Sequence, residues 1–270
     1  MTDRRFDFSY ARVSSVISGE TEPPLAEDSR VTVPVVDVLE SPGGARERQL
    51  LYNDALEVLD IREGWAFARA RAVGFVGYVA ANAITRDEEL PIPDHWVAAR
   101  MTHAYRAPDL KSKEVMALSM GTTLSPLERE NSFVRTEAGW VPEQHLTGTI
   151  EGDPVAVAER LLGTDYLWGG NSAFGIDCSG LVSLAFIMCG ELTMQDSDLQ
   201  RLHDGTAIDD GSIRRGDLWF WEGHVAIVAS DTRLIHANAH HMAVVHEDIE
   251  TALARIGPTV ARKRVIPPRG

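Results

Sequence analysis

A glycine-rich stretch that runs into an apolar segment most constrains this chain. Residues 166–182 read YLWGGNSAFGIDCSGLV, and the apolar run SGLVSLAFIMC follows directly on Cys178. The run predicts a helix closed by Gly190. A thiol at a helix N-terminus faces unpaired backbone N–H groups and the positive end of the helix dipole, which favour the thiolate. Cys178 is therefore expected to be a nucleophile.

Net charge and length limit the kinds of partner and the number of domains. The 270 residues exceed one average domain, so two or three domains are expected. The net charge of −14 argues against nucleic acid or an anionic membrane surface as the main partner. A small cationic or amine-bearing substrate is compatible with this charge.

The second cysteine, Cys189, is interpreted as a small buried apolar residue. On one helix the two thiols lie roughly 16 Å apart, too far for a disulfide. The N-terminal segment has no apolar core of signal-peptide length, and no later segment approaches transmembrane length. The expected location is the cytoplasm.

Short β-branched runs separated by turn signals fill the first half of the chain. They predict a lead-in at residues 1–30, a small barrel at 31–86 and a second barrel at 95–147. The two barrels share a closing pattern, GYVAANAI in the first and GWVPEQHL in the second. This repetition indicates duplicated domains.

The sequence pattern changes at Asp153. Asp153 and Pro154 form a helix start, and the predicted helix runs to Gly163. The cysteine helix comes next, and strand-like runs follow from Leu218: LWFW, HVAIVAS, RLIHAN, MAVVHED and KRVIP. Helices first and antiparallel strands afterwards predict an α+β domain at residues 151–268, with the cysteine helix packed on the sheet.

A thiolate that attacks a carbonyl needs a base, and nine histidines are available. His224 opens the run HVAIVAS and His236 lies in the next run. A hairpin with a five-residue loop centred on Ser230 places the two histidines opposite each other on one face. One ring could then orient the other. Taken singly, each histidine is more simply a half-buried strand residue.

Residues 151–266 resemble the NlpC/P60 family of papain-like cysteine peptidases, which cleave peptides derived from the bacterial cell wall. The motifs that carry the resemblance are YLWGG, GIDCSGLV, DSDLQ, RGDL, GHVAIV and IHAN. The resemblance implies that Cys178 is the nucleophile, His224 the base and His236 the residue that orients the base. Both upstream segments resemble bacterial SH3 (SH3b) domains.

This architecture is similar to that of the γ-D-glutamyl-L-diamino acid endopeptidases. The resemblance implies a small murein peptide, L-Ala-γ-D-Glu-diamino acid, as substrate in cell-wall peptide recycling, and no cofactor or metal. It also implies substrate-binding residues around the nucleophile: Tyr166, Asp177, Ser179, Asp196 and Ser197. A negative charge at Asp177 would raise the pKa of the neighbouring thiol, so binding the substrate's α-ammonium group would account for it.

Other interpretations of these residues remain open. Asp196 and Ser197 could cap a helix, and Tyr166 and Trp168 could pack under the active-site loop. The backbone N–H of Cys178 is the obvious oxyanion donor, with Tyr166 as a second.

The resemblance also implies that the first barrel blocks one end of the cleft. Glu63, Trp65 and Tyr78 are its candidate residues for this contact.

Three other functions compete with this peptidase. An amidase or acyltransferase could use the same papain-like core, because fold does not fix substrate. A non-catalytic binder of wall fragments would not need a nucleophile and a base. A metal site at HANAHH, residues 236–241, fits no zinc spacing. The sequence gives no oligomeric state.

Overall fold

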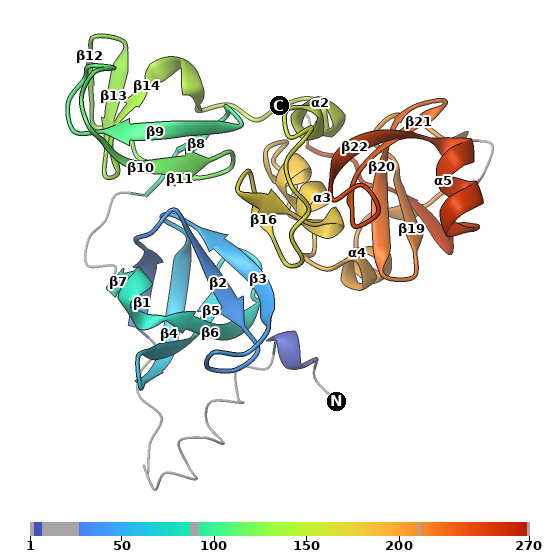
Figure 1. Cartoon of the computed structure of the whole chain (residues 1–270), viewed down its shortest axis with the longest axis horizontal. Coiled ribbons are helices and arrows are strands. Elements are labelled where there is room, and N and C mark those ends of the chain that lie inside the picture. Colours follow the sequence, from blue (N-terminus) through green and yellow to red (C-terminus); the bar gives the residue numbers. More distant parts are fainter. Residues whose placement is uncertain (1–2, 7–26, 87–91, 210–211, 269–270) are drawn as a thin grey trace, which may run out of the picture. The chain divides into compact units, whose positions relative to one another are not determined.

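The computed structural model describes residues 3–6, 27–86, 92–209 and 212–268 (Figure 1). Contacts divide the chain into two compact units. The first comprises Met1–His95, Thr102–Leu118 and Thr122–Gln144, and the second Trp96–Met101, Ser119–Gly121 and His145–Gly270. The second unit therefore includes three short stretches of the predicted second barrel, residues 96–101, 119–121 and 145–147. The predicted lead-in falls largely outside the described residues, and the domain boundaries remain predictions.

The first unit begins with a seven-stranded antiparallel sheet in the order β3-β2-β6-β5-β4-β1-β7. Its strands are β1 (Glu27–Val31), β2 (Val35–Leu39), β3 (Arg46–Leu51), β4 (Ala55–Arg62), β5 (Trp65–Ala70), β6 (Val76–Ala80) and β7 (Ile84–Arg86). Alternate aliphatic side chains bury one core. The one-turn helix η1 (Arg4–Phe6) adds Phe6, whose ring lies 5.9 Å from that of Phe75.

The second β segment forms a five-stranded sheet in the order β10-β9-β14-β13-β12. Its strands are β9 (Met101–Tyr105), β10 (Glu114–Ser119), β12 (Glu128–Glu130), β13 (Phe133–Thr136) and β14 (Gly139–Pro142). Shorter strands of the same segment are β8 (His95–Val97), β11 (Thr123–Leu124) and β15 (Leu146–Thr147).

The repeated closing pattern takes the same local structure in both segments. GYVAANAI forms the end of β6, the one-turn helix η2 (Ala81–Ala83) and the start of β7. GWVPEQHL forms β14, the one-turn helix η3 (Glu143–His145) and the start of β15. The predicted repetition of a strand, a polar turn and a strand is therefore present.

The second unit contains a six-stranded sheet in the order β18-β23-β19-β20-β21-β22. The strands are β18 (Thr206–Ala207), β19 (Leu218–Trp221), β20 (His224–Ser230), β21 (Arg233–Asn238), β22 (Ala243–Asp248) and β23 (Ala261–Arg264). The helices are α2 (Pro154–Glu159), α3 (Cys178–Ile187), α4 (Ser197–His203) and α5 (Ile249–Ile256), and a small hairpin pairs β16 (Asn171–Ser172) with β17 (Gly175–Ile176).

Two helices lie on opposite faces of this sheet (Figure 1). Alternate residues such as Val225 and Ile235 share a core with α3, which is buried from Cys178 to Phe186. The intervening residues, such as Ala226 and Leu234, share a second core with α5. The predicted packing of the cysteine helix on the sheet is therefore confirmed.

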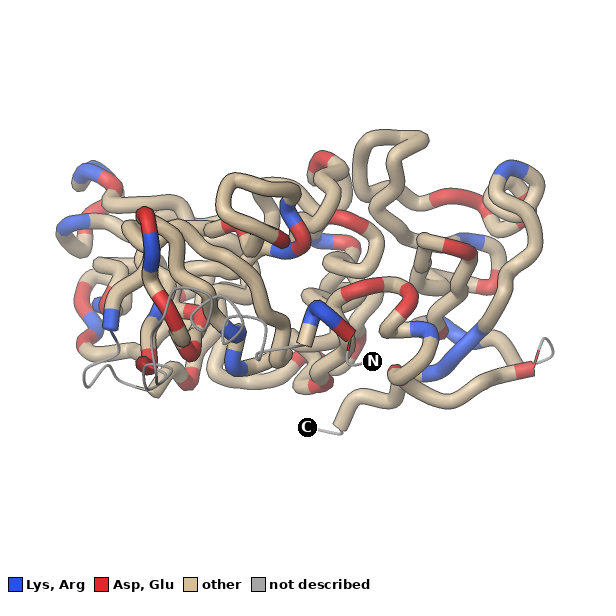
Figure 2. The backbone as a smooth tube through the Cα atoms, turned by 90° about the horizontal axis from the view of Figure 1, so that it is seen from below, with Lys and Arg blue, Asp and Glu red and all other residues tan. Residues whose placement is uncertain are grey.

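Residues from the second β segment complete the core of α3. Met120 is fully buried in this core, and Trp96 and Ala98 pack against it. Arg160 donates to the carbonyl of Ala98 at 2.9 Å, and Ser119 Oγ accepts from the N–H of Ala173 at 2.9 Å. Acidic and basic residues are interspersed along both units (Figure 2).

Candidate active site

Cys178 is the first residue of α3, as the sequence predicts. Its side chain belongs to the buried core and is 7% exposed. The helix ends at Ile187, so Cys189 lies in the turn beyond it, and Gly190 closes this turn at φ +77°. The two thiols are not joined. Burial, followed by the charges of nearby Glu151 and Asp153, raises the pKa of Cys189 to about 11.

Asp177 is the N-cap of α3, a role that the sequence interpretation missed. Its Oδ1 accepts from the N–H of Gly180 at 2.7 Å and from Ser179 Oγ at 3.0 Å. Its Oδ2 accepts from the N–H of Gly169 at 2.9 Å. The carboxylate thus joins the glycine-rich loop to the first turn of the helix. An Asp one residue before a long apolar run is the signal that could have revealed this cap.

Close backbone contacts explain the glycines of this stretch. A Cβ atom on Gly180 would lie 2.3 Å from the carbonyl oxygen of Gly170, and one on Gly170 would lie 2.5 Å from that of Gly175. Both contacts are with backbone, which cannot move aside as a side chain can. The loop therefore packs directly on α3 and fixes where Cys178 sits.

The structure brings His224 and His236 together. Nε2 of His224 and Nδ1 of His236 are 3.0 Å apart, and the ring centroids are separated by 5.2 Å. The predicted shared face is correct. The predicted direct opposition is wrong, because Ile227 pairs with Ile235 and a register shift follows Val228. The register continued from Ile227 places His236 opposite Ala226, so the two histidines are diagonal neighbours, still within reach of each other.

Two charged residues behind His236 were not anticipated from the sequence. Nε2 of His236 lies 3.0 Å from Oε2 of Glu247 on β22. Arg255 on α5 donates to both oxygens of Glu247, at 3.1 and 2.5 Å. The helix that carries Arg255 was itself missed, although Ile249, Ala252, Leu253 and Ile256 have amphipathic helical spacing.

Burial keeps both histidines neutral. It is the largest cause that lowers the pKa of His224 to about 3, and the charges of His236 and Arg255 add to it. It also lowers the pKa of His236 to about 4, against the opposing effect of Glu247. A neutral imidazole has a lone pair that can accept a proton, as a base requires.

The segment DSDLQ forms the start of α4. The helix begins at Ser197 after Asp196, but the Asp196 side chain makes no capping hydrogen bond. Gln200 is fully buried and donates to the carbonyls of Ser179 and Met194, at 3.0 and 2.8 Å. These bonds hold α4 against the first turn of α3.

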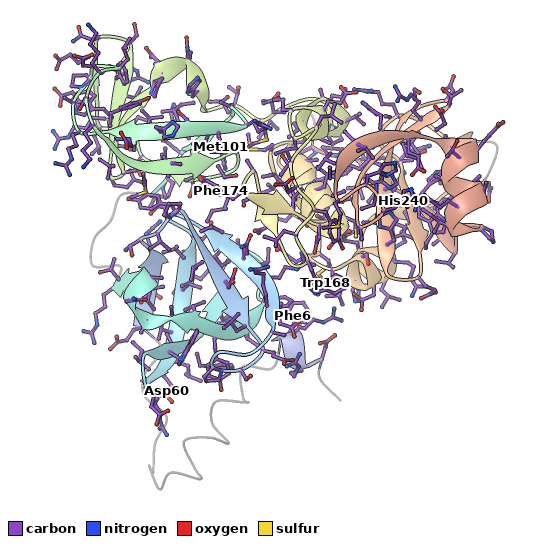
Figure 3. The ribbon with its side chains drawn as sticks, viewed as in Figure 1. Phe6, Asp60, Met101, Trp168, Phe174 and His240 are labelled. Atoms are coloured by element: carbon purple, nitrogen blue, oxygen red, sulfur yellow. The ribbon has the colours of Figure 1, made fainter. Side chains whose placement is uncertain are left out.

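The two aromatic residues of YLWGG differ in exposure. Tyr166 is partly buried against the α3 core, and its N–H donates to the carbonyl of Met242 at 2.9 Å. Trp168 is 68% exposed (Figure 3), so the interpretation that it packs under the loop is wrong.

The candidate residues of the first β segment lie in the first unit. Glu63 occupies the exposed turn between β4 and β5 at φ +50°, and Trp65 begins β5. Tyr78 on β6 packs its ring 5.0 Å from that of Phe67. Their part in the site stays a prediction.

The HANAHH segment is held by its own hydrogen bonds. Oδ1 of Asn238 accepts from the N–H of His241 at 2.8 Å and lies 3.0 Å from its Nδ1. Among the described residues, no group of three or more His, Cys, Asp or Glu side chains could hold a metal ion. Within the same residues, no helix is both long and apolar enough to cross a bilayer.

Family models match two parts of the chain. Residues 163–255 match the NlpC/P60 family, and residues 38–84 match the bacterial dipeptidyl-peptidase SH3 domain. The first match contains Cys178, His224, His236 and Glu247.

Two curated relatives match this chain over different lengths. Dipeptidyl-peptidase 6 of Lysinibacillus sphaericus is 25% identical over 251 residues, which cover 77% of this chain and 90% of the relative. A gamma-D-glutamyl-L-lysine dipeptidyl-peptidase of Bacillus subtilis is 30% identical over 139 residues, covering 44% of this chain and 46% of the relative.

A solved structure shares the fold. The crystal structure of an NlpC/P60 family protein from Bacillus cereus matches with a TM-score of 0.80 at 20% identity, covering 89% of this chain and all of that one. The expected α+β class, with SH3-like β structure ahead of the peptidase fold, is therefore confirmed. The chain accordingly contains an NlpC/P60 domain at residues 163–255, preceded by a bacterial dipeptidyl-peptidase SH3 domain at residues 38–84.

Proposed function

We propose that this protein is a cysteine peptidase that hydrolyses the γ-D-glutamyl-diamino acid bond of murein peptides with a free N-terminal L-Ala, in cell-wall peptide recycling. The observation that carries the proposal is a cysteine at the start of a buried helix together with a contacting pair of neutral histidines, all within the NlpC/P60 match. The names of the two dipeptidyl-peptidase relatives support the choice of substrate.

The chemistry assigns one role to each group. The thiol of Cys178 gives its proton to His224, and the sulfur attacks the γ-carbonyl carbon of D-Glu. The oxyanion that forms accepts a hydrogen bond from the backbone N–H of Cys178 at the helix N-terminus. His224 then returns the proton to the amine of the departing diamino acid. Water, deprotonated by His224, hydrolyses the acyl-enzyme to release L-Ala-D-Glu.

Selection of a free N-terminus is the second part of the proposal. Asp177 and Asp196 would provide negative charge for the substrate's α-ammonium group, with Ser179, Ser197, Tyr166 and Trp168 around it. The hydrogen bonds from Gly169, Ser179 and Gly180 fix the orientation of the Asp177 carboxylate beside the nucleophile.

One assay tests the reaction. The reduced protein is incubated with L-Ala-γ-D-Glu-meso-diaminopimelate, and L-Ala-D-Glu is expected as product. Cys178→Ala should reduce its release to background. Absence of the dipeptide with reduced wild-type protein would refute the proposed reaction, and acyl transfer to an added amine would favour an acyltransferase instead.

A matched substrate tests the pocket. N-acetylation of the L-Ala residue removes the positive charge and leaves the scissile bond unchanged. We expect the acetylated peptide to lose at least about tenfold in kcat/KM, because an ion pair with a buried carboxylate is lost. Equal turnover of both peptides would remove Asp177 and Asp196 from substrate binding.

A further inference from the structure

A buried carboxylate lies directly behind the histidine pair. Glu247 pairs with Leu234 across β22 and β21, and His236 pairs with Val245, two residues before Glu247. The side chains of Glu247 and His236 therefore lie on the same face of the sheet, the face covered by α5. The side chain of Glu247 is 6% exposed and that of His236 is 0% exposed. Their nearest atoms, Oε2 and Nε2, are 3.0 Å apart. A carboxylate is rarely buried without such a partner.

Arg255 keeps this carboxylate ionised. Burial alone would raise the pKa of Glu247, but the hydrogen bonds and charge of Arg255 outweigh burial and hold the pKa below its usual value. Because Arg255 donates through both Nε and Nη2, the carboxylate is also fixed in orientation.

The fixed charge selects the tautomers of both histidines. Nε2 of His236 makes no regular hydrogen bond, although Oε2 of Glu247 lies 3.0 Å from it. The charge of Glu247 determines the tautomer of His236, because at 3.0 Å a carboxylate attracts an N–H and repels a lone pair. The proton of His236 is then on Nε2, and its Nδ1 accepts the Nε2–H of His224. The lone pair of His224 is left on Nδ1.

We propose that Glu247, fixed by Arg255, is a positioning residue that sets the proton arrangement of His236 and His224, so that Nδ1 of His224 is the atom that takes the Cys178 proton. This inference rests on the proposed function, in which His224 is the base. When Sγ–H loses its proton to Nδ1, the positive charge on His224 is balanced through His236 by Glu247. The proton does not pass to Glu247 itself.

The charges that surround the pair make this support necessary. Arg255 disfavours a positive charge on both His224 and His236. A positive charge on His224 is also disfavoured by His236, and one on His236 by His241. Glu247 favours a positive charge on each of the two rings. Removal of Glu247 should therefore reduce the population of the thiolate–imidazolium pair.

The test reads Cys178 without any substrate. Iodoacetamide alkylation of Cys178 is followed by mass spectrometry at pH 6, where the thiolate depends on the imidazolium, and at pH 10, where it does not. In Glu247→Gln the ratio of the pH 6 rate to the pH 10 rate should fall about tenfold, and kcat should fall about 10- to 100-fold with little change in KM. Asp248→Asn is the matched control: it is the next residue on β22, its side chain is 70% exposed, and its ratio should not change.

A merely structural role predicts a different result. Loss of packing would lower the melting temperature or both alkylation rates together, and an unchanged ratio in Glu247→Gln would overturn the inference. If that variant does not fold, Glu247→Asp, which keeps the charge but moves it by one methylene, should lower the ratio about threefold. An unchanged ratio there would overturn the inference as well.

The outcome is separable from that of the proposed function. A reduced ratio in a protein that releases no L-Ala-D-Glu would retain the positioning role and refute the substrate. Release of L-Ala-D-Glu with an unchanged ratio would retain the substrate and refute the positioning role.

Discussion

The two cysteines differ in chemistry because Cys178 begins α3 whereas Cys189 lies in the turn beyond its end. Cys178 is at the N-terminus of α3, where helix N–H groups stabilise a thiolate. Cys189 is fully buried beyond the C-terminal end, and burial raises its pKa to about 11. At pH 7 iodoacetamide should therefore modify Cys178 and spare Cys189, as measured by peptide mass spectrometry.

Substitution of Cys189 tests whether activity depends on Cys178 alone. Cys189→Ala should keep kcat/KM within about twofold of wild type, because Cys189 is far from the proposed site and the change is small. Labelling of Cys189 ahead of Cys178 would contradict this assignment.

The residues that meet at the candidate site were predictable where a sequence motif contains them, and were not predictable where contacts between distant elements bring them together. Cys178, His224 and His236 were selected from the sequence, and the structure joins the two histidines. Glu247 lies in a run read only as a strand, and its importance comes from Arg255, eight residues later on another element. Likewise, Asp177 was considered for its charge, and its capping bonds require the loop at Gly169 to return to the helix.

The loop-to-helix contact at Gly180 determines how α3 is placed. Gly180→Ala would put Cβ 2.3 Å from a backbone carbonyl oxygen, so either the glycine-rich loop or α3 has to move. We expect a loss of several kcal/mol in the free energy of unfolding, measured by urea denaturation.

Gly152→Ala is the matched control for this change. A Cβ atom at Gly152 has open space around it, with no atom within 4 Å. Its free energy of unfolding should stay within about 0.5 kcal/mol of wild type. Equal stability of the two variants would show that the loop does not pack on α3 as described.

Helices and strands were predictable to the extent that the local pattern determined them. The apolar run after Cys178 gave α3, and Asp153-Pro154 gave the start of α2. The hairpin of β20 and β21 was placed in the wrong register, because its connection is the two residues between Ser230 and Arg233 and not a five-residue loop centred on Ser230. The helix α5 was missed despite its amphipathic spacing.

A partly buried carboxyl group in the first unit, that of Asp54, makes the stability of the protein depend on pH. Burial raises the pKa of Asp54 from 3.8 to about 6, against its hydrogen bond from the N–H of Leu51. The folded state therefore binds this proton more tightly than the unfolded state. Stability contributed by the protonated form is present below about pH 4 and is lost as pH rises through about 6.

Asp54→Asn should remove this dependence. The amide oxygen can still accept from Leu51, and the cost of a buried charge is absent, so the variant should gain about 1–2 kcal/mol at pH 7 and nothing at pH 4. Asp28→Asn, a half-exposed residue of β1, is the control and should show no such gain. Denaturant unfolding at both pH values measures the effect, and equal gains at pH 4 and pH 7 would contradict it.

The division of the molecule was only partly predictable. Two β segments and a C-terminal α+β part follow from local patterns and a repeated closing motif. No local pattern indicates that Met120 is buried in the α3 core, because the other buried members of that core lie at least 35 positions away.

The inclusion of Met120 and Trp96 in that core has a consequence for synthesis on the ribosome. Val265, a member of the same core, is translated about 145 residues after Met120, or roughly 7–30 s later at ordinary elongation rates. During that interval the core around these apolar side chains is incomplete. The nascent chain is therefore open to chaperone binding, and the peptidase fold closes only when nearly the whole polypeptide has emerged.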